Sequence, residues 1–144
     1  MWTKQIKESY VSKLKKYVCR FILLAIFAVI LAAVCKIYNS RYAGIESKIE
    51  QIVVSGLQVS DKEGHIELQW NEVSEHSEID GYRVFRRIDQ GNFEYVDSTD
   101  QTEFVDNEAV AGVYNYYRVY PYKEVNGKTI IGQSENYVYI KPSI

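Results

Sequence analysis

The first third of the chain contains one unbroken apolar run, FILLAIFAVILAAVC, from Phe21 to Cys35. Ten of its residues are Phe, Ile, Leu or Val, the types that insert most favourably into a bilayer. A helix of this run alone is about 22 Å long, shorter than the hydrocarbon core of about 30 Å. If Arg20 and Lys36 snorkel, the span lengthens enough, so the pattern predicts a transmembrane helix over residues 21–38.

The residues that precede this run are basic. Positions 1–20 hold six Lys or Arg residues against one acid, Glu8. Because cytoplasmic flanks gather Lys and Arg, residues 1–20 are expected to be a cytoplasmic segment and the rest of the chain to lie outside. Cleavage by a signal peptidase, or lipidation at Cys35, is an alternative. An uncleaved anchor is preferred, because the run lacks a small-x-small site and Val34 is unusual before a lipidated Cys.

Beyond the membrane helix, apolar residues keep a helical spacing for two more heptads. They recur at intervals of four, three, four and three residues: Tyr38, Tyr42, Ile45, Ile49 and Ile52. This is the spacing of a coiled-coil seam, so residues 39–53 are predicted to form a helical stalk. Two heptads are too few for a stable coiled coil, so we expect the stripe to lie on the domain or the lipid surface. A homodimer through the stalk is the alternative.

From Gly56 onward the apolar period changes to two, which is typical of half-buried strands. Ile66, Leu68 and Trp70, for example, alternate with polar residues, and Asn126-Gly127 is a strong hairpin signal. Seven short strands without intervening helices predict an all-β antiparallel sandwich. The expected strands are Leu57–Val59, His65–Trp70, Gly81–Ile88, Phe93–Asp97, Glu103–Asp106, Asn115–Lys123 and Gln133–Lys141.

Charge and cysteine content exclude several kinds of function. The net charge is −2, but residues 41–144 hold ten cations against eighteen acids. An acidic exported domain has no electrostatic basis for binding nucleic acid, so no nucleic-acid partner is expected. The cysteines, Cys19 and Cys35, lie in or beside the membrane helix. The domain therefore has neither a disulfide nor a Cys-based zinc site, and no cofactor is expected.

Residues 54–141 carry five landmarks in order. They are Leu57-Gln-Val59, Ile66-Glu-Leu-Gln-Trp70, Ile79-Asp-Gly-Tyr-Arg-Val-Phe-Arg-Arg87, Phe104-Val-Asp106, and Gly112 with Tyr116-Tyr-Arg-Val119. In their order and spacing these landmarks resemble a fibronectin type III domain. The resemblance implies a seven-stranded immunoglobulin-like sandwich with sheets A-B-E and C′-C-F-G, Trp70 packed beside Tyr82 in the core, and no enzyme activity.

One position departs from the pattern of that family. Asn115 stands where the family usually has a corner tyrosine. Either Tyr114 takes this role through a shift of register, or the Asn115 amide hydrogen-bonds the loop.

No catalytic or metal site is expected. His65 and His76 belong to no recognisable motif, and the exported part lacks a Cys nucleophile. The acidic loop over residues 71–80 offers carboxylate oxygens, but it lacks the alternating Asp/Asn ladder and the Gly of a calcium loop. Its charges are therefore interpreted as solvated.

The best candidate for a binding site is the outward face of the C′-C-F-G sheet. Strand alternation places six residues there: Arg83, Phe85, Arg87, Tyr116, Arg118 and Tyr120, with Tyr137 or Tyr139 as further candidates. Tyr and Arg are enriched at interface hot spots. Cross-strand aromatic pairs covered by Arg stems also stabilise a sheet without any partner, so both interpretations are open.

Taken together, these patterns predict a single-pass protein of the cell membrane with a cytoplasmic N-terminus. Residues 21–38 contact the lipid bilayer, and the C-terminal domain is extracytoplasmic. The expected function is noncatalytic protein–protein interaction with another envelope or surface protein. The alternative is a carbohydrate- or cell-wall-binding accessory module, since exposed tyrosines suit sugar stacking, although a flat sheet with few Trp residues lacks a sugar groove.

Overall fold

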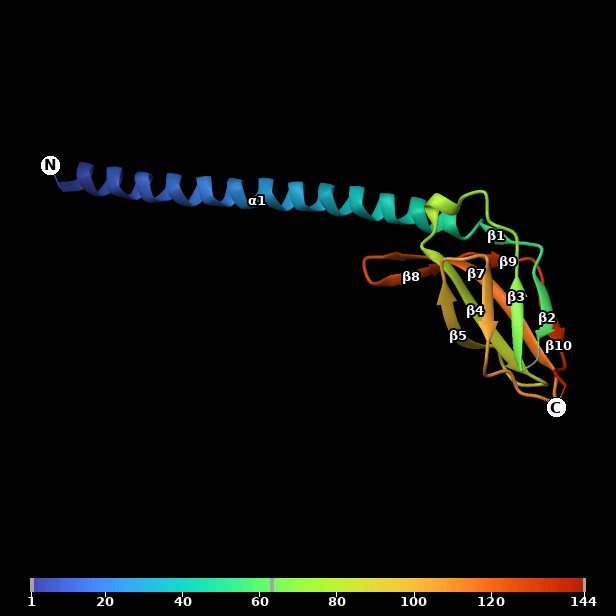
Figure 1. Cartoon of the computed structure of the whole chain (residues 1–144). Coiled ribbons are helices and arrows are strands. Elements are labelled where there is room, and N and C mark those ends of the chain that lie inside the picture. Colours follow the sequence, from blue (N-terminus) through green and yellow to red (C-terminus); the bar gives the residue numbers. More distant parts are fainter. Residues whose placement is uncertain (1, 63, 144) are drawn as a thin grey trace. The chain divides into compact units, whose positions relative to one another are not determined.

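The computed structural model describes residues 2–62 and 64–143, with side chains from residue 7 onward. The chain divides into two compact units, Met1–Ala43 and Gly44–Ile144. Helix α1 runs from Trp2 to Ile49 as one continuous helix, so its last turns, residues 44–49, belong to the second unit (Figure 1).

The apolar run in α1 is exposed on all sides of the helix. Phe21 and Val29 are each 70% exposed, and no side chain of the apolar stretch is buried. A helix that is apolar all round needs either a protein core or a membrane around it. Within the described residues, α1 is the one helix long and apolar enough to cross a membrane, by length and composition.

The helix ends at Ile49, four residues before the predicted end of the stalk. Glu50 and Gln51 form a turn, and β1, Val53–Val54, follows after Ile52. The cause is a competing hydrogen-bond partner: Gln133 N–H donates to the Ile52 carbonyl (2.8 Å) and Glu135 N–H to the Val54 carbonyl (3.0 Å). The β-branched residues Val53 and Val54 also favour an extended backbone.

The C-terminal part of the predicted stripe lies in the core of the second unit. Ile49 is 1% exposed and Ile52 is 4% exposed. Two polar contacts accompany this burial: Lys48 Nζ lies 2.7 Å from Glu78 Oε1, and Gln133 Nε2 donates to the Glu50 carbonyl (2.8 Å). The last turn of α1 is therefore part of the domain and not a separate stalk.

The domain is a sandwich of two antiparallel sheets (Figure 1). One has the order β2-β3-β6, from Gln58–Lys62, His65–Gln69 and Glu103–Asp106. The other has the order β10-β7-β4-β5, from Val138–Ile140, Asn115–Val125, Gly81–Ile88 and Glu94–Thr99. These are the two sheets implied by the resemblance, with A-B-E as the first and C′-C-F-G as the second.

The strand count differs from the prediction, because the described residues form ten strands and not seven. The extra elements are short. After Asn126-Gly127, whose φ angles are 54° and 76°, β8 (Lys128–Ile131) pairs with β7. The predicted last strand, Gln133–Lys141, is divided into β9 (Gln133–Ser134), which pairs in parallel with β1, and β10, which pairs with β7. The segment changes partner midway, which a period of two cannot reveal.

The core is built from the inward residues of both sheets. Ile66, Leu68, Tyr82, Tyr117 and Val119 are fully buried. Trp70, just after β3, is 6% exposed, and its ring packs edge-to-face on Tyr82 with centroids 5.3 Å apart. The pairing of Trp70 with Tyr82 that the resemblance implied is therefore present, and it joins the two sheets.

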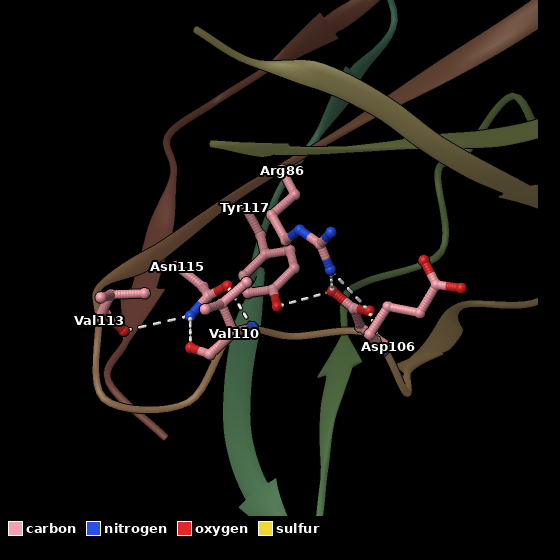
Figure 2. Close-up of polar contacts among 7 residues, drawn as sticks. Arg86, Asp106, Val110, Val113, Asn115 and Tyr117 are labelled. Atoms are coloured by element: carbon pink, nitrogen blue, oxygen red, sulfur yellow. Dashed lines mark hydrogen bonds and ion pairs between the residues drawn. The ribbon is translucent and has the colours of Figure 1, made fainter. Parts of the chain in front are cut away.

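A buried polar group connects β6 to β4 and β7 (Figure 2). Asp106, 2% exposed, accepts hydrogen bonds from Arg86 Nη1 (3.0 and 2.7 Å) and from the Tyr117 hydroxyl (2.8 Å), and it also accepts one from the Glu108 N–H (2.9 Å). Its charge is thus paired and its oxygens are satisfied, which a buried carboxylate requires.

Asn115 replaces the corner tyrosine by means of its amide (Figure 2). The side chain is fully buried, and its Nδ2 donates to the carbonyls of Val110 (2.8 Å) and Val113 (3.1 Å). Its Oδ1 accepts from the Val110 N–H (3.1 Å). Of the two alternatives left open by the sequence, the structure shows the second, because Tyr114 is 44% exposed.

Replacing the core indole tests this packing. Trp70→Ala should lower the free energy of unfolding by about 3–5 kcal/mol, because it removes a buried ring and leaves a cavity against Tyr82. The measurement is urea unfolding of the full chain in detergent micelles. Tyr139→Ala is the control, since Tyr139 is 58% exposed and should cost far less. Equal losses for the two variants would contradict the core described above.

The buried Tyr117 hydroxyl makes the free energy of unfolding depend on pH in the alkaline range. Burial, reinforced by its hydrogen bond to Asp106, raises the pKa of Tyr117 above its usual value. Burial also raises the pKa of Tyr82. Above a pH of about 10 the unfolded chain therefore loses these protons before the folded chain does, so the free energy of unfolding should fall as pH rises. Below that pH this contribution is fully present.

Tyr117→Phe should remove part of the fall in the free energy of unfolding at alkaline pH, and the part due to Tyr82 should remain. Urea unfolding of wild type and variant at neutral and alkaline pH gives the two slopes. Tyr139→Phe serves as the control, since it alters an exposed phenol and should keep the wild-type slope. A Tyr117→Phe slope identical to that of the wild type would reject the assignment.

Candidate functional site

The antiparallel pairing of β4 with β7 brings the six predicted site residues onto one face. The register pairs Arg87 with Tyr116, Phe85 with Arg118, and Arg83 with Tyr120. All six are partly exposed, whereas the residues between them on each strand face the core. Their placement follows from strand alternation alone.

Neighbouring strands extend this face on both sides. Tyr95 of β5 pairs with Phe85, and Tyr139 of β10 pairs with Tyr116. We call the whole surface the outer face. It comprises Arg83, Phe85, Arg87, Phe93, Tyr95, Tyr114, Tyr116, Arg118, Tyr120, Tyr122, Tyr137 and Tyr139.

Four of these residues were missed by the sequence reasoning: Phe93, Tyr95, Tyr114 and Tyr122. The sequence also did not reveal that Tyr137, one of the further candidates, contacts both Arg87 and Arg118. For Tyr122 a signal existed, because it continues the alternation of Tyr116, Arg118 and Tyr120. For Tyr95 and Phe93 the signal is tertiary, because the β-bulge between Val84 and Phe85 shifts the register of β4 against β5. A bulge of this kind cannot be located from periodicity.

In one half of the outer face the arginine charge is paired, although the buried Arg83 Nε has no hydrogen-bond partner among the described residues. The Phe85 ring packs edge-to-face against Tyr95 (5.8 Å between centroids) and Tyr120 (5.5 Å). The Arg83 guanidinium lies over Tyr122 (4.9 Å) and donates to Glu124 Oε1 (2.9 Å) and Thr129 Oγ1 (3.1 Å). Such pairs stabilise a sheet without any partner protein, so this half of the outer face can serve stability alone.

The other half holds two arginines that stack on rings but have no acidic partner. Arg87 lies over Tyr116 (4.1 Å to the centroid) and Phe93 (5.1 Å). Arg118 lies over Phe93 (5.0 Å) and Tyr137 (5.7 Å), and donates to the Tyr120 hydroxyl (3.3 Å). In the part of the chain that the structure describes, neither forms an ion pair, and the buried Nε of each has no hydrogen-bond partner.

Four tyrosines cluster beside these arginines. The Tyr116 ring contacts Tyr137 (5.8 Å) and Tyr139 (5.5 Å), and Tyr114 contacts Tyr139 (5.9 Å). Tyr114, Tyr137 and Tyr139 are 44%, 45% and 58% exposed, and Lys141 Nζ lies 5.8 Å from the Tyr114 centroid. This end of the outer face is therefore aromatic and positively charged.

The acidic loop over residues 71–80 is held by contacts with α1, with β7 and within the loop itself. Hydrogen bonding to Lys48, together with its charge, lowers the pKa of Glu78. Asp80 accepts from the Glu124 N–H (2.8 Å) and lies 3.4 Å from Lys123 Nζ, and Glu72 lies 3.4 Å from His76 Nδ1. Among the described residues no group of three or more His, Cys, Asp or Glu side chains is placed to hold a metal ion.

Comparison with known proteins identifies the fold. No protein-family model and no curated protein matches the chain. The domain is similar in structure to the fibronectin type III domain of the human KIAA0970 protein, with a TM-score of 0.52 and 19% identity over 73% of this chain and 82% of that one. The sandwich is thus fibronectin type III-like, as the five sequence landmarks predicted.

Two further structures align at lower scores. A Fn3-like protein from Clostridium thermocellum has a TM-score of 0.46 and 19% identity, over 61% of this chain and 96% of that one. A β-1,2-glucanase from Parabacteroides distasonis has a TM-score of 0.49 and 18% identity over 65% of this chain. The alignment covers only 13% of the glucanase.

Proposed function

We propose that the chain is a single-pass membrane protein whose fibronectin type III-like domain is a noncatalytic protein–protein interaction module. The apolar run of α1 supports the anchor, and the basic residues before it support a cytoplasmic N-terminus and an extracytoplasmic domain. The partner is another envelope or surface protein. Because the second unit begins at Gly44, soon after the predicted end of the membrane helix at Tyr38, we expect the partner to belong to the same cell.

The observation that carries this proposal is the exposure of rings beside uncompensated guanidinium groups. Tyr137 and Tyr139, in the same half of the outer face as Arg87 and Arg118, are 45% and 58% exposed. Exposed aromatic groups on one surface point to an interaction site, and Tyr and Arg dominate interface hot spots. Arg87 and Arg118 add charges that no described residue neutralises.

A second candidate function is binding of carbohydrate or cell wall. The cluster of Tyr114, Tyr116, Tyr137 and Tyr139 favours it, because exposed rings provide stacking surfaces for sugars. If this function is correct, the full chain should co-sediment with purified cell-wall polysaccharide, and Tyr137→Ala with Tyr139→Ala should abolish the co-sedimentation.

A homodimer through the helix can use only the part of the stripe that the domain leaves exposed. Ile49 and Ile52 are in the core. Leu31 and Tyr38 are 53% and 52% exposed, and Cys35 is an exposed free thiol in the same helical phase. Any pairing between chains therefore involves the N-terminal part of the apolar stripe, from Leu31 to Tyr38.

The topology is tested by protease accessibility. Since the basic flank precedes the apolar run, protease added to intact cells, or to spheroplasts where an outer barrier exists, should digest residues 44–144. A tag at the N-terminus should stay protected until the cells are lysed, which provides the internal control. Digestion of the tag with protection of the domain would reverse the proposed orientation.

The partner surface is tested by a paired substitution. Arg118→Ala with Tyr120→Ala should remove the protein crosslinked to the wild-type chain in native membranes, because it deletes one guanidinium and one ring from the outer face. The melting temperature should fall by no more than about 8 °C, since Tyr120 contributes one edge-to-face contact with Phe85.

The matched control is Gln58→Ala with Gln69→Ala, a cross-strand pair of exposed residues on the other sheet. This variant should keep the crosslinked partner. If the Arg118 and Tyr120 variant folds and still captures every partner, the outer face is not the interaction site. If it unfolds, these side chains serve stability alone.

A further inference from the structure

Arg87 and Arg118 form a matched pair of cationic groups on adjacent strands. The register pairs Arg118 with Phe85 and Tyr116 with Arg87, so the two arginines are diagonal neighbours on β4 and β7. Both lie within 6 Å of the same two rings, at 5.1 and 5.0 Å from Phe93 and at 5.8 and 5.7 Å from Tyr137. The rings hold the guanidinium planes in place before any ligand arrives.

The charge of this pair is uncompensated in a domain rich in acids. Residues 41–144 carry eighteen acidic residues, and four of these form ion pairs with Lys48, Arg83, Arg86 and Lys123. Across the described residues, none lies within 4.0 Å of Arg87 or Arg118. Stacking on rings occupies the guanidinium faces, and the Nε of each arginine is buried. The Nη groups are the donors left for an external acceptor, and one of them, Arg118 Nη1, also donates to the Tyr120 hydroxyl.

We propose that Arg87 and Arg118 bind two carboxylates of an extended acidic segment of the partner protein. This inference rests on the protein–protein function proposed above and names the chemistry of the partner. Diagonal neighbours on paired strands lie about 7–8 Å apart. Alternate side chains of an extended segment lie about 6.6–6.8 Å apart, close to the spacing of the two strand positions, so Asp or Glu at positions i and i+2 would each face one arginine.

The aromatic surroundings favour a polypeptide over a phosphate or a lipid headgroup. Phe93, Tyr116 and Tyr137 border the arginines, and Tyr137 is 45% exposed. Rings beside a guanidinium give a partner side chain both apolar contact and directed hydrogen bonds. Recognition of acidic motifs by arginine clusters is an established mode of peptide binding.

The test uses synthetic peptides as probes and the full chain in nanodiscs of zwitterionic lipid. A peptide of alternating Thr and Glu should bind, as measured by fluorescence anisotropy. A peptide of the same composition with the repeat Glu-Glu-Thr-Thr has no two Glu residues at positions i and i+2. It should bind several-fold more weakly, since its adjacent carboxylates point to opposite sides of an extended chain. A peptide of alternating Thr and Gln should not bind.

Two double variants distinguish binding by Arg87 and Arg118 from a general effect of the net charge of the whole domain on the peptide. Arg87→Gln with Arg118→Gln should weaken binding of the Thr–Glu peptide at least tenfold. Lys62→Gln with Lys128→Gln removes the same net charge elsewhere and should change binding less than twofold. Because loss of the stacked arginines can also unfold the sheet, circular dichroism accompanies each measurement. Arg87→Lys with Arg118→Lys keeps the charge and should still bind more weakly than wild type, because Lys lacks the planar fork.

Several outcomes would overturn the inference. Equal weakening of peptide binding by both Gln double variants would show that binding depends on net charge and not on this pair. Binding by the Lys variant as strong as that of the wild type would show the same. Competition by inorganic phosphate at the concentration of the peptide, or binding to phosphatidylglycerol vesicles without binding to the peptide, would assign the pair to a phosphate group. If the crosslinked partner is lost on Arg118→Ala with Tyr120→Ala but the Thr–Glu peptide does not bind, the proposed function stands and the acidic-segment inference fails.

Discussion

The pairing of β4 with β7 is the constraint on which the rest of the domain depends. Because side chains alternate along each strand, this single register assigns every residue of both strands to the core or to the outer face. Tyr82, Val84, Tyr117 and Val119 fill the core, and arginines alternate with rings on the other side. A slip of one residue would bury the guanidinium groups and expose the tyrosines of the core, so the hydrophobic effect enforces the register that also builds the candidate site.

Buried polar groups hold this register in place at one end of the sandwich. Asp106 of β6 joins Arg86 of β4 to Tyr117 of β7, and Asn115 ties the start of β7 to the loop before it. Apolar packing tolerates small shifts, whereas a buried carboxylate left without its donors is costly, so these contacts favour one arrangement of the strands. They also fix the position of Arg87, which directly follows Arg86.

The outer face divides into a part whose arginine charge is paired with a carboxylate and a part whose arginine charges are not. Around Phe85 and Arg83, rings and ion pairs satisfy one another. Around Arg87 and Arg118, stacking orients the charges without neutralising them. On this difference we base the distinction between residues that stabilise the sheet and residues proposed to recognise a partner. It also explains why an acidic domain would recognise an acidic segment: the local charge is positive although the total is negative.

The sequence by itself determined the long apolar helix, the sandwich with its two sheets, the Trp70 and Tyr82 core and the six residues on one face. The apolar helix and the six residues on one face follow from local periodicity, which acts over one strand or one helical turn. The two sheets and the contact of Trp70 with Tyr82 were implied by the resemblance to fibronectin type III domains. Strand alternation needs no knowledge of the partner strand, so the outward direction of Arg87 and Arg118 was predictable.

Only the tertiary structure decided the features that depend on contacts distant in sequence. The end of α1 at Ile49 results from hydrogen bonds to Gln133 and Glu135, and the division of the last strand from its change of partner. The inward Arg86 gave no signal, because its acceptor, Asp106, lies twenty residues away on another sheet. Likewise, periodicity places an arginine on a face, but whether a carboxylate neutralises it there depends on how distant segments pack.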